Sequence, residues 1–152
     1  MSKVISFQKD ISSLLSLFHD GLICNHQLNG NTLCFDIEIE YLASEVNPLY
    51  KKFFLKLEGV SSLSFRPWKN DNSIVSEALC DFFRAELEIL ESNFSSNRIY
   101  VQLSQDSKMF DFCGGELSFI AKSCSVSDEG EQCYDLQDIQ SLCAKYWNGF
   151  LS

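Results

Sequence analysis

The strict alternation of side chains from Leu33 to Tyr41 is the feature that most constrains the fold. Because successive side chains of a β-strand point to opposite faces, this pattern predicts a strand with one face in a core and the other in water. Shifting the register by one residue would bury three carboxylates, each at an effective penalty of several kcal/mol. We therefore expect a central strand. Its core face is Leu33, Phe35, Ile37, Ile39 and Tyr41, and its solvent face is Cys34, Asp36, Glu38 and Glu40.

Two neighbouring segments are predicted to pair with this strand. The run 22–28 is joined to it by Asn29-Gly30-Asn31, and Asn-Gly between extended runs is typical of a hairpin. On the other side, 52–57 repeats the alternation, which places lysines beside the carboxylates if the strands run antiparallel. Gly59 is expected to end that strand, which continues over 63–66 as far as Pro67. The inward residues of 52–57 are Phe53, Leu55 and Leu57, and the outward lysines are Lys52 and Lys56.

Amphipathic helices are predicted at both ends of the chain. Apolar residues recur at helical spacing over 7–18, with Ser6 as the expected N-cap and the Gly21 turn as the stop. The serines at 12, 13 and 16 are expected on the solvent face. A second apolar face spans 136–150, with Asp135 as cap and Gly149 at the end.

The segment 73–91 has two interpretations, one long helix or a helical turn followed by a strand. We predict a helical turn over 73–80 and a strand over 83–91, because the strand 99–103 needs a partner. A last strand is expected over 116–126, followed by a charged loop at 128–131. The prediction is a single α+β domain over residues 1–152. It has one antiparallel sheet of six or seven strands, curved or sandwich-like, with an N-terminal and a C-terminal helix.

The net charge of −9 is concentrated in the second part of the chain. Residues 1–70 hold seven basic and seven acidic side chains, whereas residues 71–152 hold five basic and fourteen acidic ones. An acidic protein repels phosphate backbones, which argues against nucleic-acid binding and favours a basic protein partner. We expect that partner on an acidic surface of Glu86, Glu88, Glu91, Asp128, Glu129 and Glu131. No segment has the length and apolarity of a membrane span or signal peptide, so no membrane association and a cytoplasmic location are expected.

The sequence predicts no catalytic, cofactor-binding or metal-ligating residue. The seven cysteines include no C-x-x-C pair, and we expect them to be reduced and structural. No nucleotide-binding loop or zinc-protease motif is present. The candidate polar site is His19, Asp20 and the second histidine, His26, because a carboxylate beside an imidazole can orient a general base. A helix-ending turn also accounts for His19 and Asp20, just as a solvated strand face accounts for the acidic residues of 36–40.

Four short motifs resemble small bacterial proteins of unknown function that include a polymorphic-toxin immunity family. They span residues 18–126 and consist of Phe18-His19-Asp20-Gly21, the acidic strand from Phe35 to Glu40, the Gly-Val segment from Phe54 to Leu63, and the strand from Gly114 to Phe119. The resemblance implies a non-enzymatic binding protein that neutralises a partner toxin.

Two classes of function therefore stay open at the sequence level. One is an acidic interaction protein of the immunity type, without chemistry of its own. The other is a ligand-binding or enzymatic α+β domain with a pocket among its aromatic residues. The pocket residues would be Phe35, Tyr41, Phe53, Phe65 and Phe119.

Overall fold

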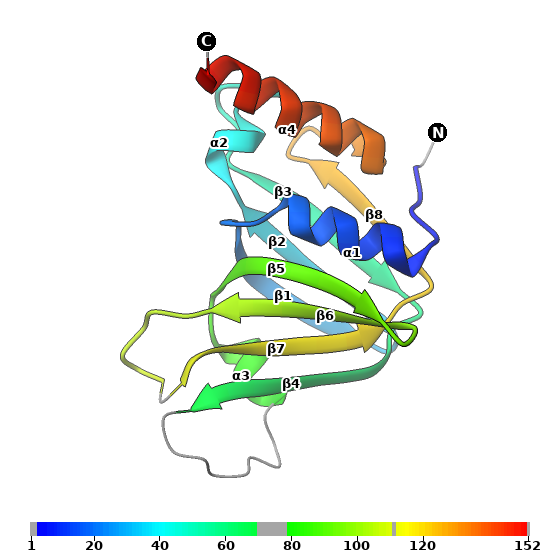
Figure 1. The fold of residues 1–152 in the computed structure, drawn as a ribbon, viewed down its shortest axis with the longest axis vertical. Helices are drawn as coiled ribbons and strands as arrows, with labels where there is room; N and C mark the ends of the chain where they lie inside the picture. Colours follow the sequence, from blue (N-terminus) through cyan, green and yellow to red (C-terminus); the bar gives the residue numbers. More distant parts are fainter. Residues whose placement is uncertain (1–2, 70–78, 111, 152) are drawn as a thin grey trace.

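A computed structural model describes residues 3–69, 79–110 and 112–151, which form four helices and nine strands (Figure 1). The helices are α1 (Gln8–Leu17), α2 (Glu40–Ala43), α3 (Leu79–Arg84) and α4 (Leu136–Leu151). The strands are β1 (Leu22–Asn29), β2 (Thr32–Glu38), β3 (Lys52–Glu58), β4 (Ser61–Lys69), β5 (Leu87–Ser95), β6 (Arg98–Ser104), β7 (Phe112–Ile120), β8 (Ser123–Asp128) and β9 (Cys133–Tyr134). None of these helices is long and apolar enough to cross a membrane.

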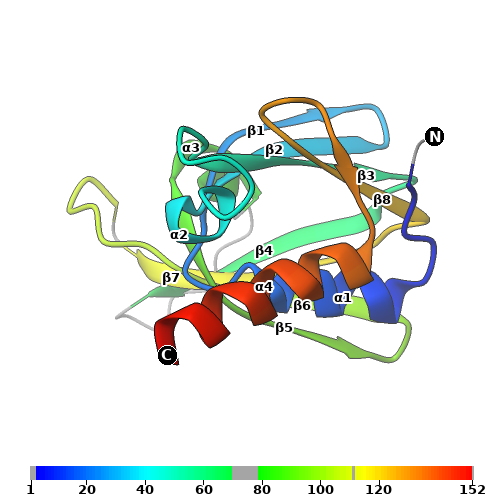
Figure 2. The ribbon, with the colours of Figure 1, turned by 90° about the horizontal axis from the view of Figure 1, so that it is seen from above.

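All nine strands belong to one antiparallel sheet, in the order β4-β7-β6-β5-β1-β2-β3-β8-β9. The α+β class and the terminal helices are confirmed, but the sheet has nine strands rather than six or seven. β1 and β5 share only two residue pairs, Leu22 with Glu88 and Ile23 with Leu87. The sheet bends at this short junction, so that the strands β1-β2-β3-β8 face the strands β5-β6-β7-β4. Figure 2 shows the first group in the upper half of the picture and the second group in the lower half.

The alternating strand is central, as predicted, and its register follows the side-chain pattern. Ile37 of β2 pairs with Ile23 of β1 on one side and with Phe53 of β3 on the other. Leu33, Phe35 and Ile37 are buried, and the exposed carboxylates Glu38 and Glu40 face away from the core. The ion pair between the Lys52 Nζ and the Asp36 Oδ2 (3.1 Å) confirms the expected cross-strand contact.

The predicted end of this strand is wrong by three residues. The strand stops at Glu38, and Ile39 accepts the backbone N–H groups of Leu42 and Ala43, which begins α2. Tyr41 consequently lies on a helix, half-buried, with its ring 4.6 Å from that of Tyr146 in α4. The local hydrogen bonds to the Ile39 carbonyl therefore end the strand, although the apolar–polar alternation of the sequence continues to Tyr41.

The predicted strand over 116–126 is two strands in different parts of the sheet. β7 pairs with β4 and β6, whereas β8 pairs with β3 and β9. The chain turns between them at Lys122, whose N–H donates to the Glu58 carbonyl (2.9 Å) beside the turn from β3 to β4. Gly59 has a φ of +66° there, and an added Cβ would lie 2.6 Å from the Lys122 side chain. The turn at Gly59 and the turn at Lys122 therefore pack against each other, and this packing favours a residue without a side chain at position 59.

The helix α1 is confirmed, but its cap and its polar face differ from the prediction. Phe7 rather than Ser6 precedes the helix, and no side chain caps it. Ser12 is buried instead of solvated, because its Oγ lies 2.9 Å from the Oγ of Ser92 in β5, and Ser16 donates to the Ser92 carbonyl (2.9 Å). Hydroxyl groups thus dock α1 on the sheet beside its apolar face.

The helix α4 begins as predicted, with a reciprocal cap. The Asp138 N–H donates to Asp135 Oδ1 (2.8 Å), and the Asp135 N–H donates to Asp138 Oδ2 (2.9 Å). The helix continues to Leu151, so Gly149 does not end it. The predicted turn over 73–80 lies outside the described residues except for Leu79 and Cys80, which begin α3. The strand predicted over 83–91 is β5, which starts at Leu87 and extends to Ser95.

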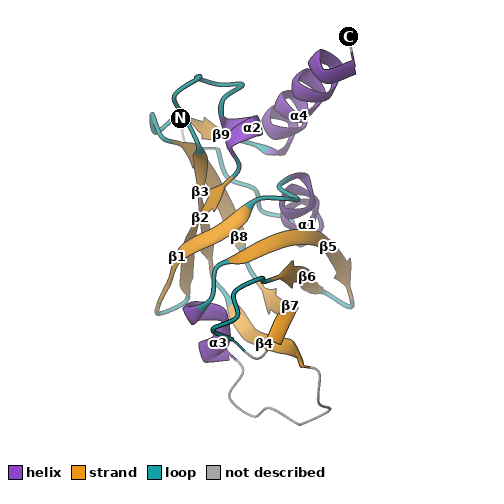
Figure 3. Cartoon of the chain, turned by 90° about the vertical axis from the view of Figure 1, so that its left-hand side faces the viewer, coloured by secondary structure: helices purple, strands orange, loops and turns teal. Residues whose placement is uncertain are grey.

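Aromatic side chains fill the space between the two parts of the sheet. Phe53 lies 5.4 Å from Phe18 between ring centroids, and Phe65 lies 5.9 Å from Phe82 of α3. Phe35, Phe53, Phe65 and Phe119 are all buried, so four of the five predicted pocket residues are core residues. Figure 3 shows α3 at one end of this core and α4 at the opposite end, with α1 between them.

Candidate functional site

A hollow of about 550 Å³ lies at the bend where β1 meets β5, and we call it the acidic hollow. Segments distant in sequence form it: the turn after α1, the end of α3, the start of β5 and the loop between β6 and β7. Its lining residues are Asp20, Leu22, Arg84, Glu86, Glu88, Ser104, Gln105, Asp106, Ser107, Met109 and Phe110. The hollow thus unites Glu86 and Glu88 of the predicted acidic surface with Asp20 of the predicted polar site.

Backbone hydrogen bonds place Asp20 beside β5. Its N–H donates to the Ile89 carbonyl (2.8 Å), and the Ile89 N–H donates to the Gly21 carbonyl (2.8 Å). Asp20 adopts the left-handed conformation, with a φ of +72°. Gly21 then passes close to β2, where an added Cβ would meet Ile37 Cγ2 at 2.5 Å. The predicted helix stop is therefore correct in place, but Asp20 takes the unusual φ and Gly21 permits the close approach.

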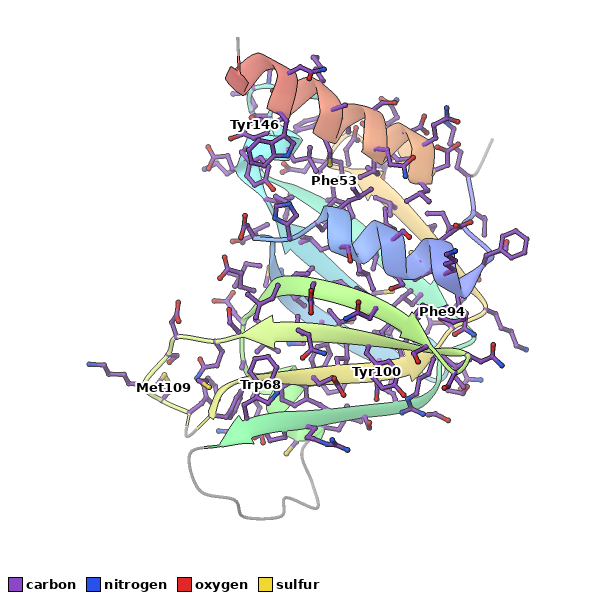
Figure 4. The ribbon with its side chains drawn as sticks, in the orientation of Figure 1. Phe53, Trp68, Phe94, Tyr100, Met109 and Tyr146 are labelled. Atoms are coloured by element: carbon purple, nitrogen blue, oxygen red, sulfur yellow. The ribbon has the colours of Figure 1, made fainter. Side chains whose placement is uncertain are left out.

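A buried amide holds the loop that carries Asp106. The Gln105 side chain is 7% exposed, and its Nε2 donates to the carbonyls of Phe112 (2.6 Å) and Ser107 (2.9 Å). Its Oε1 accepts the Ser107 N–H (2.7 Å). Met109 is 87% exposed on the projecting loop (Figure 4), and the Arg84 guanidinium lies 5.5 Å from the Phe110 ring centroid.

The electrostatic balance of the acidic hollow is strongly negative. Asp20, Glu86, Glu88 and Asp106 contribute four carboxylates against the single guanidinium of Arg84, a local net charge of −3. Ser104 donates to Glu88 Oε2 (3.3 Å), which orients that carboxylate at the edge of the hollow. A concave wall lined by charges of one sign strengthens the local field and attracts cationic groups.

The structure divides the predicted acidic surface into separate places. Glu86 and Glu88 line the acidic hollow, and Glu91 is exposed further along β5. Glu129 lies near the start of β3, where its Oε2 accepts the Lys51 N–H (2.6 Å), and Glu131 is exposed in the same loop. The six residues therefore do not form one continuous surface.

Asp128 corrects the predicted surface, because it is only 2% exposed. Its Oδ1 accepts the N–H groups of Gly130 (2.8 Å) and Gln132 (3.0 Å), and its Oδ2 accepts the Tyr134 hydroxyl (2.6 Å). Burial and this hydrogen bond raise the pKa of Tyr134. The carboxylate organises the loop between β8 and β9 and is unavailable to a partner.

Replacing Asp128 by alanine is expected to destabilise the protein by about 2–4 kcal/mol, because the buried Tyr134 hydroxyl and two part-buried N–H groups lose their acceptor, and a buried donor without an acceptor costs roughly 1–3 kcal/mol. Glu131→Ala removes one charge from the same loop without removing such an acceptor and should change stability by less than about 0.5 kcal/mol. Urea denaturation of both variants measures the difference. Equal effects would mean that the lost charge, rather than the hydrogen bonds, matters.

The predicted polar site is not assembled in the structure. His19 Nδ1 lies 3.2 Å from Asp20 Oδ2 at an exposed position, and Tyr41 donates to the His19 carbonyl (3.2 Å). His26 instead packs at α3, where its Nε2 contacts the Phe82 carbonyl and its ring lies 4.8 Å from the Phe82 ring. His19 therefore contacts Asp20, whereas His26 has different partners at α3.

The environment of His26 predicts a loss of stability in acid. Burial lowers its pKa from 6.5, and the carbonyls of Phe82 and Ala85 and the charge of Glu86 offset this only in part. Its buried Nδ1 has no hydrogen-bond partner among the described residues. A lowered pKa in the folded state means that the stabilisation is complete above pH 6.5 and is lost as the pH falls through the folded value. Unfolding curves from pH 7.5 to 4.5 should show a steeper acid loss for the wild type than for His26→Gln. Parallel curves would refute a neutral, buried imidazole.

The seven cysteines are free thiols. All seven lie in the described part of the chain, and none forms a disulfide. Burial raises the pKa of both Cys24 and Cys124 to about 12, which disfavours the nucleophilic thiolate. Cys24 and Cys124 are buried, whereas Cys80 and Cys113 are exposed and do not contribute to the core. Within residues 3–69, 79–110 and 112–151, no group of His, Cys, Asp and Glu has the arrangement of a metal site.

Sequence reasoning missed three important residues of the acidic hollow. Arg84, Asp106 and Gln105 come from segments that showed no motif, and only the pairing of β5 with β1 and β6 brings those segments together. Comparison of the chain with protein-family models, curated protein sequences and solved structures finds no match. The residues of the hollow therefore carry the functional interpretation.

Proposed function

We propose that the protein is a non-enzymatic interaction protein that binds a basic protein partner at the acidic hollow. The observation that carries this proposal is the convergence of Asp20, Glu86, Glu88 and Asp106 around one concavity with a single opposing cation, Arg84. Opposite fields speed encounter and disfavour wrong partners, so this arrangement suits selection of a basic surface.

The shape of the site supports insertion of a partner side chain. A hollow of about 550 Å³ has room for a lysine or arginine, whose charge would meet Glu86 and Glu88. The exposed Met109 supplies apolar contact area at the rim. A protein bound here by such anchors would have its basic surface covered, which is how an immunity-type protein would neutralise a toxin.

The test is capture of a defined partner followed by an activity measurement. The protein is immobilised and exposed to an extract of its native host. It should retain a basic protein that is encoded next to its own gene. That partner, purified, should lose its activity when the protein is added in equimolar amount. A neighbouring product that neither binds nor is inhibited, with no other basic protein retained, would contradict the proposal.

A further inference from the structure

A second hollow, of about 260 Å³, lies on the solvent face of β4, β7 and β6, and we call it the arginine hollow. Sheet register brings its residues together: Ser118 of β7 lies between Ser64 and Tyr100, and Glu116 lies opposite Arg66. Figure 4 shows Tyr100 on this part of the sheet, apart from Met109, which lines the acidic hollow. The lining residues are Ser64, Arg66, Arg98, Tyr100, Glu116 and Ser118.

The Arg98 guanidinium is held in place from one side. Its Nη2 donates to the Ser118 Oγ (3.0 Å) and contacts the Ser62 carbonyl, and the two serine hydroxyls at positions 64 and 118 lie 3.0 Å apart. All of these contacts use one nitrogen. The Nε and Nη1 groups of Arg98 donate to no other residue in the described part of the chain and retain donors for another acceptor.

Arg66 offers a second guanidinium in the arginine hollow. Arg66 is exposed, and its guanidinium makes no hydrogen bond or ion pair with another of the described residues. The Glu116 carboxylate opposite it accepts the Gln102 Nε2 instead (2.7 Å). The charges of the two guanidiniums and the one carboxylate of Glu116 sum to +1 in this hollow, on a chain whose net charge is −9.

We propose that the arginine hollow binds an oxyanion, a carboxylate or phosphate group, between Arg66 and Arg98. Guanidinium groups present paired N–H donors that match the two oxygens of such groups, and charge-assisted bonds of this kind are the stronger class. Tyr100 and the serine hydroxyls supply neutral donors around the same space. This site has the opposite sign to the acidic hollow and does not depend on the function proposed for that hollow.

The experiment is an NMR titration of the ¹⁵N-labelled full-length protein at pH 7 and constant ionic strength. The probes are sodium succinate, sodium phosphate and, as a neutral analogue, succinamide. Succinate, phosphate or both should give saturable shifts centred on residues 64–66, 98–100 and 116–118, and succinamide should not. Saturation by only one anion would identify that group as the natural ligand chemistry.

Variants distinguish a built site from general ion effects. Arg66→Gln should weaken anion binding at least about tenfold, as expected for loss of a charge-assisted bond. Arg98→Lys keeps the charge but loses the planar guanidinium and should also weaken anion binding. Lys9→Gln on α1 removes the same charge as Arg66→Gln and should leave anion binding unchanged. Linear shifts without saturation, or equal binding by all four proteins, would overturn the proposal. Substituting Glu86 and Glu88 should leave anion binding unchanged, which separates this test from that of the acidic hollow.

Discussion

Replacing Ile37 by alanine should lower the free energy of unfolding by about 2–5 kcal/mol, the range for a large aliphatic residue removed from a packed core. Ile37 is 0% exposed and lies between Ile23 and Phe53 in the middle of the sheet. Gly21 packs against its Cγ2 atom, so the surrounding backbone has little freedom to fill the cavity. Phe35→Ala should have a loss of similar size, because Phe35 is only 3% exposed on the same face.

The control is Glu38→Ala, one residue from Ile37 on the opposite face. Its side chain is exposed, so the expected change is less than about 0.5 kcal/mol. Guanidinium denaturation of the three variants gives the comparison. A Glu38→Ala loss as large as that of Ile37→Ala would mean that the carboxylate is buried and that the assignment of the two faces is wrong.

Gly114→Ala is expected to cost at least about 3 kcal/mol, because overpacking and backbone strain add at this position. An added Cβ would overlap the Leu103 carbonyl oxygen of the paired strand β6, a backbone atom that cannot move alone. The φ of Gly114 is +153°, a conformation that residues with side chains rarely adopt. Thermal unfolding and the yield of folded protein both report the loss.

Gly149→Ala is the matched control for this substitution. Outside the backbone of α4 and the two neighbouring residues, no atom of the described residues lies within 4 Å of the position that its Cβ would occupy. Alanine in a helix is favoured over glycine by roughly 0.5–1 kcal/mol, so this variant should be slightly more stable than the wild type. If the two alanine variants have the same stability, the close approach of β7 and β6 at Gly114 is incorrect.

The sequence was sufficient to predict side-chain parity and the pairing of neighbouring strands. Alternation and Asn-Gly turns are local signals, so the hairpin of β1 and β2 and its pairing with β3 follow from them. The cap at Asp135 is equally local. The α+β class then follows from adding the two terminal helices.

The incorrect predictions depend on contacts between distant segments. The chain leaves β7 for β8 at Lys122, which contacts the distant turn at Glu58 and Gly59. From the sequence, Asp128 is expected to be a solvated loop residue and Ser12 a surface residue. In the structure Tyr134 covers Asp128, and Ser92 contacts Ser12. Local polarity gives no indication of such partners.

The acidic hollow could be predicted only in part for the same reason. The negative charge of 71–152 was visible in composition, and Glu86 and Glu88 were identified from it. The sequence predicts Asp20 in the polar site with the two histidines, and it gives no signal for Asp106. Their meeting depends on the short β1–β5 junction, which no sequence pattern indicates.

The most direct test of the acidic hollow as a docking site is the affinity of the purified basic partner for two charge-matched variants. Glu86→Gln with Glu88→Gln lowers the local net charge of the hollow from −3 to −1, and Glu40→Gln with Glu131→Gln removes the same charge from exposed positions elsewhere. Calorimetry at low and high salt should show at least about a tenfold loss of affinity and a weaker salt dependence for the first variant only. Equal affinities for the two double variants would contradict a partner held at the acidic hollow.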